Sequence, residues 1–149
     1  MKILLADPHH EVRSALRLAL EQQPDIRVVD EACDTIELFG QLTNECPDVV
    51  LLDPDLPGFQ ISSRVGRSPL GELVEIFHKL CFALRVISLR SQPNAEKDCM
   101  LAKADAFFCK SDPPDALLAL LQRAAPGTSE KNTSKTWFNN SSLPHPIEK

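Results

Sequence analysis

The chain has 149 residues, a formal net charge of −5 and 43% hydrophobic residues. This length fits one domain better than two, and the composition is that of a globular protein rather than a disordered chain. The acidic balance disfavours nucleic acid as a default partner, because phosphate binding normally shows as a basic excess. No apolar run reaches the ~18 residues of a membrane span, and the N-terminus lacks the basic-then-apolar order of a signal peptide. A cytoplasmic protein is therefore expected.

The five cysteines are scattered along the chain, with no Cys-x-x-Cys pair and no histidine paired with any of them. They stand at Cys33, Cys46, Cys81, Cys99 and Cys109. An odd number at such spacings is not typical of a zinc site or of a disulfide framework. Reduced core cysteines in a cytosolic protein are therefore expected.

Short apolar runs alternate with helical patterns through residues 1–125. Strands are predicted at residues 2–6, 26–29, 49–52, 84–89 and 106–109. Helices are predicted at residues 10–23, 35–45, 69–81, 93–102 and 113–124. The third strand is apolar on both faces, as a central strand of a parallel sheet is, and the last helix has a proline in its first turn. The alternation predicts an α/β fold, a doubly wound five-stranded parallel sheet with helices on both faces.

The composition changes after the last predicted helix. Residues 126–149 are rich in Ser, Thr, Asn, Pro and Lys and show no sustained period. We therefore expect a folded domain over residues 1–125 and a flexible C-terminal tail over residues 126–149. The Trp137–Phe138 pair is the only large apolar feature of this tail, and is either a docking anchor or an exposed remnant.

Charged residues stand where four of the predicted strands end. Asp7 follows the first strand, Asp53 the third, Arg90 the fourth and Lys110 the fifth. In a doubly wound sheet, ligands and chemistry are placed outside the carboxyl ends of the strands. These four side chains are therefore expected to share one edge of the sheet.

Two carboxylates and a lysine at one sheet edge suit phosphoryl chemistry. A carboxylate held after a buried strand, as Asp53 would be, is able to accept a phosphoryl group and form an aspartyl phosphate. Mg²⁺ prefers one or two carboxylates with waters and phosphate oxygens, so Asp7, Asp53 and the backbone carbonyl of Asp55 form a candidate magnesium site. Lys110 would place its ammonium against the acceptor or the phosphate as a point charge.

Three stretches resemble the receiver domain of two-component response regulators, namely 3–9, 47–58 and 104–110. The similarity runs over residues 1–125, and the middle stretch, LLDPDLPG after PDVV, is the most specific of the three. The resemblance implies the flavodoxin-like strand order 2-1-3-4-5, of which a receiver is a known example.

The same resemblance implies a role for individual residues. Asp53 is the phosphoacceptor, Asp7 a metal ligand and Lys110 the lysine that bridges to phosphate. Phe107 stands where the family keeps an aromatic residue that changes rotamer on activation. The implied cofactor is Mg²⁺. The implied partners are a sensor histidine kinase or phosphotransfer protein and a downstream protein. By the same analogy, a homodimer could form through the last helix together with the strand and helix that precede it.

The chain departs from the family pattern at several positions. Receivers usually have two adjacent acidic residues after the first strand. Here Pro8 stands at the second of these positions, so one carboxylate that would bind magnesium directly or through water is missing. The neighbouring His9 is a poor replacement for a hard cation. Arg90 stands where the family has Thr or Ser, whose hydroxyl bonds to the phosphoryl group. The loop at 59–68 also looks long.

Two mechanisms remain open for this site. In the first, the domain is phosphorylated on Asp53 and Arg90 helps to bind the phosphate. In the second, Arg90 and Lys110 pair with Asp53 and Asp7, because a guanidinium near a carboxylate favours its charged form. The site would then be locked and the domain would be a phosphorylation-independent interaction module.

An enzyme is a more remote alternative. Asp53 and Asp55 also resemble the nucleophile and the general acid/base of haloacid-dehalogenase-type phosphatases. However, Pro57 replaces the usual threonine, and the length leaves no room for a cap domain. No helix-turn-helix, kinase or catalytic output module is recognisable after residue 125. We therefore expect a stand-alone receiver or adaptor that is not an enzyme, signals by protein–protein contact, and makes no direct contact with DNA or a membrane.

Overall fold

A five-stranded parallel sheet forms the centre of the molecule. The computed structural model describes residues 1–58, 69–91 and 104–124. The strands are β1 (Lys2–Ala6), β2 (Arg27–Ala32), β3 (Val49–Leu52), β4 (Arg85–Arg90) and β5 (Ala106–Cys109). They lie in the order β2-β1-β3-β4-β5, and each neighbouring pair is parallel. The predicted doubly wound sheet and its strand order are therefore confirmed.

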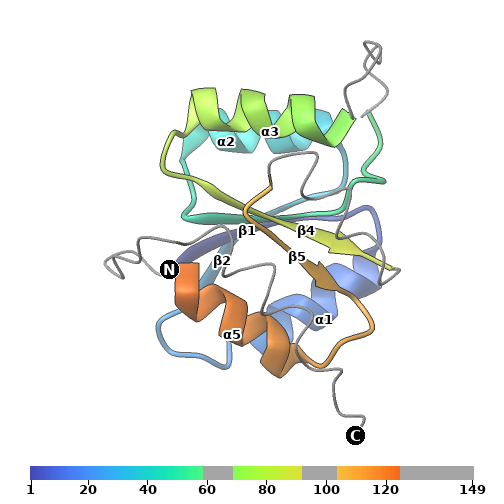
Figure 1. The fold of residues 1–149 in the computed structure, drawn as a ribbon, viewed down its shortest axis with the longest axis vertical. Coiled ribbons are helices and arrows are strands. Elements are labelled where there is room, and N and C mark those ends of the chain that lie inside the picture. The colour runs from blue at the N-terminus through green and yellow to red at the C-terminus, as the bar shows by residue number, and fades with distance from the viewer. Residues whose placement is uncertain (59–68, 92–103, 125–149) are drawn as a thin grey trace, which may run out of the picture.

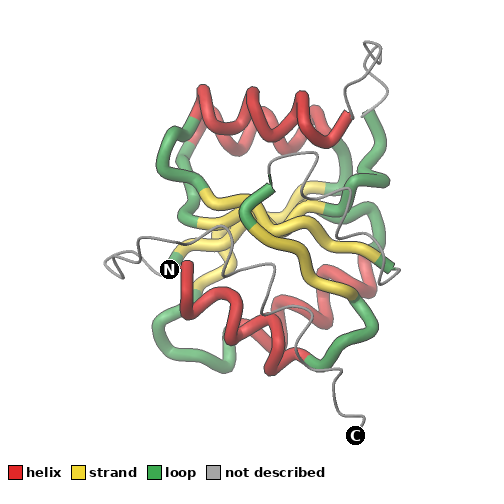
Figure 2. Tube along the Cα trace, viewed as in Figure 1, coloured by secondary structure: helices red, strands yellow, loops and turns green. Residues whose placement is uncertain are grey.

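Helices cover both faces of the sheet. The four in the described residues are α1 (His10–Leu20), α2 (Thr35–Asn44), α3 (Pro69–Leu80) and α5 (Pro114–Ala124). Figure 1 shows α2 and α3 on one face and α1 and α5 on the other, and Figure 2 shows the sheet between these two layers. None of these helices is long and apolar enough to cross a membrane. The helix expected at 93–102, the 59–68 loop and the 126–149 tail lie outside the described residues.

β3 is buried on both faces because each face packs under a pair of helices. Val50 and Leu52 belong to the core cluster that includes residues of α2 and α3. Val49 and Leu51 belong to the second cluster, with residues of α1 and α5. All four side chains are fully buried. This packing makes the carboxyl end of β3 a fixed support for the residue that follows it.

The largest differences from the predicted boundaries are at the ends of α1 and β2. α1 ends at Leu20 rather than at residue 23, because Glu21 is its C-cap and the next residues form a turn in which the Gln23 N–H donates to the Leu20 carbonyl. β2 continues to Ala32, past two acidic residues that end its apolar pattern. An edge strand keeps its backbone pairing while polar side chains face solvent, so the hydrophobic pattern underestimates its length.

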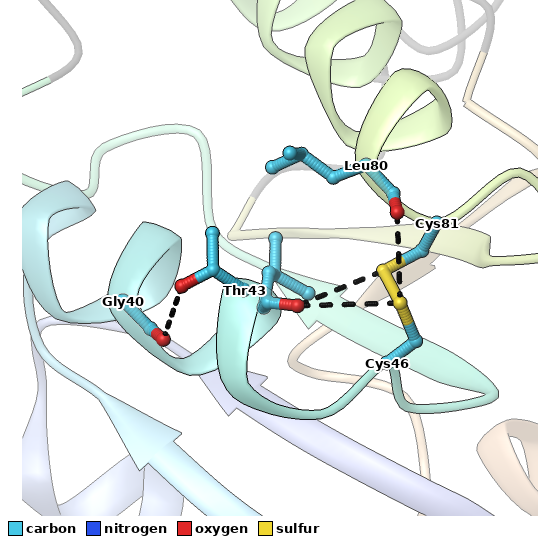
Figure 3. Close-up of a disulfide and its surroundings, with 6 residues drawn as sticks. Gly40, Thr43, Cys46, Leu80 and Cys81 are labelled. Atoms are coloured by element: carbon cyan, nitrogen blue, oxygen red, sulfur yellow. Dashed lines mark hydrogen bonds between the residues drawn. A yellow bond between two sulfur atoms is a disulfide. The ribbon is translucent and has the colours of Figure 1, made fainter.

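A disulfide joins the chain just after α2 to the end of α3. Cys46 and Cys81 are bonded to each other with their Cα atoms 5.8 Å apart, although 35 residues separate them in sequence (Figure 3). The expectation of reduced cysteines is therefore wrong for this pair, whereas Cys33 and Cys109 are free thiols. The sequence could not indicate the bond, because it depends on two helices ending side by side.

Candidate functional site

The two predicted carboxylates follow neighbouring strands. Ala6 and Leu52, the last residues of β1 and β3, are paired in register. The Asp53 N–H donates to the Ala6 carbonyl over 2.8 Å, so the ladder continues one residue beyond the strands. Asp7 and Asp53 therefore begin at the same level of the sheet edge, and both are buried, with exposed fractions of 0% and 3%.

Lys110 connects the two carboxylates. It follows β5, and its N–H donates to the Arg90 carbonyl over 2.7 Å. Its Nζ donates a hydrogen bond to Asp53 Oδ2 at 2.5 Å and forms an ion pair with Asp7 Oδ2 at 2.7 Å. The lysine side chain is itself only 16% exposed. The predicted grouping of Asp7, Asp53 and Lys110 is thus present in the structure.

Local backbone amides hold the other oxygen of each carboxylate. Asp53 Oδ1 accepts a hydrogen bond of 2.7 Å from the Asp55 N–H. Asp7 Oδ1 accepts one of 2.8 Å from the His9 N–H, and the His9 Nδ1 atom lies 2.9 Å from the same oxygen. Arg13 adds a third support, because its Nη1 donates to the Asp7 carbonyl over 2.7 Å. Both acids are therefore fixed on two sides.

Burial and charge act in opposite senses on the site. Burial disfavours the charged form of Asp7, but Lys110 and the contacts from His9 outweigh it and hold the pKa of Asp7 below its ordinary value. For Asp53, burial is the stronger effect, so its pKa is raised despite Lys110 and the Asp55 amide. Burial also opposes the charge on Lys110, but the two carboxylates raise its pKa. Lys110 is therefore firmly charged, and Asp53 is the acid that protonates more readily.

The remaining predicted residues lie in the turn after β3 and on β4 and β5. Asp55 is an exposed residue in the turn after β3, and its backbone N–H contacts the Asp53 carboxylate. Arg90 is half-buried and is the last residue of β4 rather than the residue after it. Phe107 is buried on β5 and packs with Ala104.

Sequence reasoning missed Ser88. β4 carries it directly beside Leu52 of β3 and Phe107 of β5. It is fully buried, and its hydroxyl has no hydrogen-bond partner among the described residues. Side chains two residues apart on a strand share a face, so Ser88 and Arg90 belong to the same face of β4. The signal that could have found it is the one polar residue inside the apolar run of β4.

The donor set fits a divalent cation in part. Asp7, His9 and Asp53 each offer one ligand atom, and these atoms lie within 4.8 Å of one another. Asp7 Oδ2 is buried without a hydrogen bond that meets normal geometry, although Lys110 forms an ion pair with it. Two carboxylates suit Mg²⁺, and the carbonyl of Asp55 is a further oxygen in the adjacent turn. Pro8 supplies no side-chain ligand.

The amino-acid sequence is similar to those of known response regulators. No family model matches the chain. The uncharacterized transcriptional regulatory protein YhcZ of Bacillus subtilis is 43% identical over 63 residues, which are 40% of this chain and 29% of that protein. The nitrate/nitrite response regulator NarL of Escherichia coli is 32% identical over 128 residues, 84% of this chain and 55% of NarL. The chain therefore spans only about a third to a half of these relatives.

Solved structures agree on the fold. The isolated receiver domain of RcsB from Salmonella enterica, solved with the phosphomimetic BeF3⁻, superposes with a TM-score of 0.71 over 93% of this chain and 98% of that one, at 20% identity. A LuxR-family two-component response regulator from Aurantimonas gives a TM-score of 0.67 at 25% identity, with 81% of each chain covered. The chain is a response regulator receiver domain, and its homologues and structural neighbours are the receivers of NarL, NreC and RcsB.

The relatives overturn one prediction about partners. The expectation of no direct DNA contact is wrong for this family, because YhcZ is a transcriptional regulatory protein and RcsB has been solved bound to a promoter. The acidic charge belongs to the receiver, and the match covers only 55% of NarL and 59% of the promoter-bound RcsB chain. The charge of the matched part therefore does not exclude DNA binding by the full-length relatives.

Proposed function

We propose that this receiver accepts a phosphoryl group on Asp53 within a two-component phosphorelay in the cytoplasm. The observation that carries the proposal is the Asp53 carboxylate, which sits after a fully buried strand and accepts a 2.5 Å hydrogen bond from the Lys110 ammonium. A fixed carboxylate beside a permanent positive charge suits an acceptor that gains negative charge on reaction.

The residues divide the work of the transfer between them. A bond forms between an Asp53 oxygen and phosphorus while the bond from phosphorus to the donor breaks, which leaves an acyl phosphate. Lys110 already lies against both carboxylates and offsets the charge that arrives. Mg²⁺, where bound by Asp7, Asp53 and the Asp55 carbonyl, would neutralise the phosphoryl oxygens.

Arg90 is the second residue that we propose contacts the phosphate. It is half-buried and is the last residue of β4, and its carbonyl accepts a hydrogen bond from the Lys110 N–H at the same edge of the sheet.

A locked site is the second candidate, and the contacts of Lys110 favour it. One ammonium within 2.7 Å of both buried carboxylates already does part of the work of a metal ion. In this case the domain would act as a phosphorylation-independent interaction module, with Arg90 as the second cation. In either case the domain is proposed to transmit a signal rather than to turn over a substrate.

Incubation with acetyl phosphate and Mg²⁺ separates the two candidates. Intact mass spectrometry should show one added phosphoryl group on the wild-type chain and none on Asp53→Ala. The matched control Asp25→Asn, a change in an exposed turn far from the site, should be modified like wild type. An unmodified wild-type chain would support the locked module and end the phosphoacceptor proposal.

A further inference from the structure

We propose that the C-terminal segment of this chain docks through Trp137 and Phe138 on an exposed apolar patch at the end of α3. The patch, called the Phe82 patch below, consists of Ile76 and Leu80 of α3 and of Phe82 in the turn that follows. This contact does not depend on phosphoryl transfer and lies at the opposite edge of the sheet from the carboxylates.

Three large apolar side chains are exposed close together in the sequence at the end of α3. Phe82 is 90% exposed, the highest value for a large hydrophobic residue among the described residues, and Leu80 and Ile76 are 42% and 38% exposed. Ile76 and Leu80 are four residues apart, so they lie on the same face of α3. A single exposed apolar side chain is ordinary, but a group of them is typical of a surface that another apolar group covers.

The backbone on both sides of Phe82 is fixed. Cys81 is buried and bonded to Cys46, and Leu84 is buried with its N–H donating to the Cys81 carbonyl over 3.0 Å. Phe82 and Ala83 are therefore the two central residues of a tight turn, where Gly, Pro, Asn, Asp and Ser are the usual residues. Neither the turn nor the core of the domain requires a phenylalanine here. A turn that is already fixed loses little conformational freedom when a partner covers it, which favours binding.

The C-terminal segment contains the apolar group that suits this patch. Residues 125–149 lie outside the described residues, but Trp137 and Phe138 are the only Trp, Tyr or Phe residues in that part of the sequence. Aromatic rings favour offset or edge-to-face contact with one another in addition to the gain from buried area. Three lysines and two glutamates give the segment a net charge of +1, which leaves −6 on residues 1–124 and favours association of the two.

The segment begins at the edge of the sheet where the patch lies. Leu84 directly precedes β4, so the patch is at the amino ends of the strands. α5 ends at Ala124, and its Leu121 belongs to the same core cluster as Val49, the first residue of β3. Figure 1 shows the end of α5 and the loop from α3 to β4 on the same side of the molecule as the N-terminus. Residues 125–137 extend over at most about 45 Å, and a domain of about 100 residues has a radius of gyration of about 13 Å. The segment is therefore long enough to pass from the α5 face to the α3 face of its own chain.

Tryptophan fluorescence of the full chain tests the proposal, because Trp137 is the only tryptophan and the chain has no tyrosine. Docking should shift the emission to shorter wavelength and protect the indole from acrylamide quenching relative to N-acetyltryptophanamide. Phe82→Ser removes the largest apolar contact, so it should lower the ratio of docked to undocked chains by about tenfold or more and abolish the protection. Phe82→Leu keeps an apolar side chain and should retain most of it.

An exposed leucine elsewhere provides the matched control. Leu18→Ser alters a 69% exposed residue of α1, on the other face of the sheet, and should leave the quenching unchanged. Wild-type Trp137 that is quenched like N-acetyltryptophanamide, or that is protected equally in wild type and Phe82→Ser, would overturn the proposal. Protection that falls on dilution would also overturn it, because the segment would then dock on a second copy of the chain.

Discussion

Lys110 keeps two buried carboxylates together that would otherwise repel each other. Its ammonium lies 2.5 Å from Asp53 and 2.7 Å from Asp7, and both acids are almost fully buried. Removing one member of a buried charge group leaves the other charges without compensation, which is more costly than removing the whole group. The lysine is therefore expected to support the fold as well as the chemistry.

Lys110→Met should lower the free energy of unfolding by about 3 kcal/mol, because it leaves two adjacent carboxylates unpaired. Adding Asp53→Asn removes one of those charges, so the double variant should be more stable than Lys110→Met alone. Urea unfolding of the wild type, both single variants and the double variant forms a cycle that measures the coupling. If the double variant lost as much stability as the two single variants together, Lys110 and Asp53 would not be coupled, and the proposed charge group would be contradicted.

Sequence reasoning located this group of residues but neither the buried Ser88 nor the contact of His9 with Asp7. Asp7, Asp53 and Lys110 were predictable because each follows an apolar strand, and parallel strands end at one edge of a sheet. Ser88 was not, because its place depends on the register between β4 and β3. The contact of His9 with Asp7 was also hidden, since it results from the turn of the chain at Pro8.

At the scale of elements, the disulfide fastens α2 to α3 over one face of the sheet. Leu42 and Leu80 carbonyl oxygens surround it, with the Leu42 oxygen 3.9 Å from Cys81 Sγ and the Leu80 oxygen 3.7 Å from Cys46 Sγ (Figure 3). Carbonyls at the ends of two helices disfavour a thiolate, so these cysteines suit a structural bond better than a reactive site.

Reduction of the Cys46–Cys81 bond should lower the free energy of unfolding by about 2–4 kcal/mol, since the bond closes a 35-residue loop in the unfolded chain. Guanidinium unfolding with and without dithiothreitol measures this difference. The Cys46→Ser/Cys81→Ser double variant serves as the control, and its midpoint should not respond to the reductant. If dithiothreitol also left the unfolding midpoint of the wild type unchanged, the disulfide would not stabilise the domain.

Asp105 joins the start of β4 to the turn before β5. Its carboxylate accepts a 2.7 Å hydrogen bond from the Val86 N–H, and its own N–H donates to the Val86 carbonyl over 2.9 Å. Burial raises the pKa of Asp105 above 3.8, against the opposing effects of the Val86 N–H and Arg85. The folded state thus binds the Asp105 proton more tightly than the unfolded chain does, and this contribution to stability is lost as pH rises through the folded pKa.

Asp105→Asn keeps an oxygen for Val86 but cannot ionise, so it isolates the effect of this proton. The stability of the variant relative to wild type should increase as pH is raised from below 3.8 through the raised pKa. Chemical denaturation across that range measures the difference, and Asp25→Asn provides a baseline from an exposed carboxylate. A difference that falls with rising pH would mean that ionised Asp105 stabilises the fold.

For the whole molecule, the alternation of apolar runs and helical patterns was sufficient to predict the sheet. Three strands, at 2–6, 49–52 and 106–109, have the predicted limits, because buried parallel strands are continuous apolar runs bounded by polar residues. The disulfide was not predictable, since it depends on contacts between elements distant in sequence. The prediction about DNA was wrong for this family because the charge of a chain that matches only 55% of NarL says nothing about DNA binding by the full-length relatives.

The most direct test of the account identifies the residue that carries the phosphoryl group. Treating the acetyl phosphate product with sodium borohydride reduces an aspartyl phosphate to homoserine, which peptide mass spectrometry then locates. The account predicts homoserine at position 53 and unmodified aspartate at positions 7 and 55. Homoserine at either of those positions, or at none, would contradict the central claim that Asp53 is the phosphoacceptor.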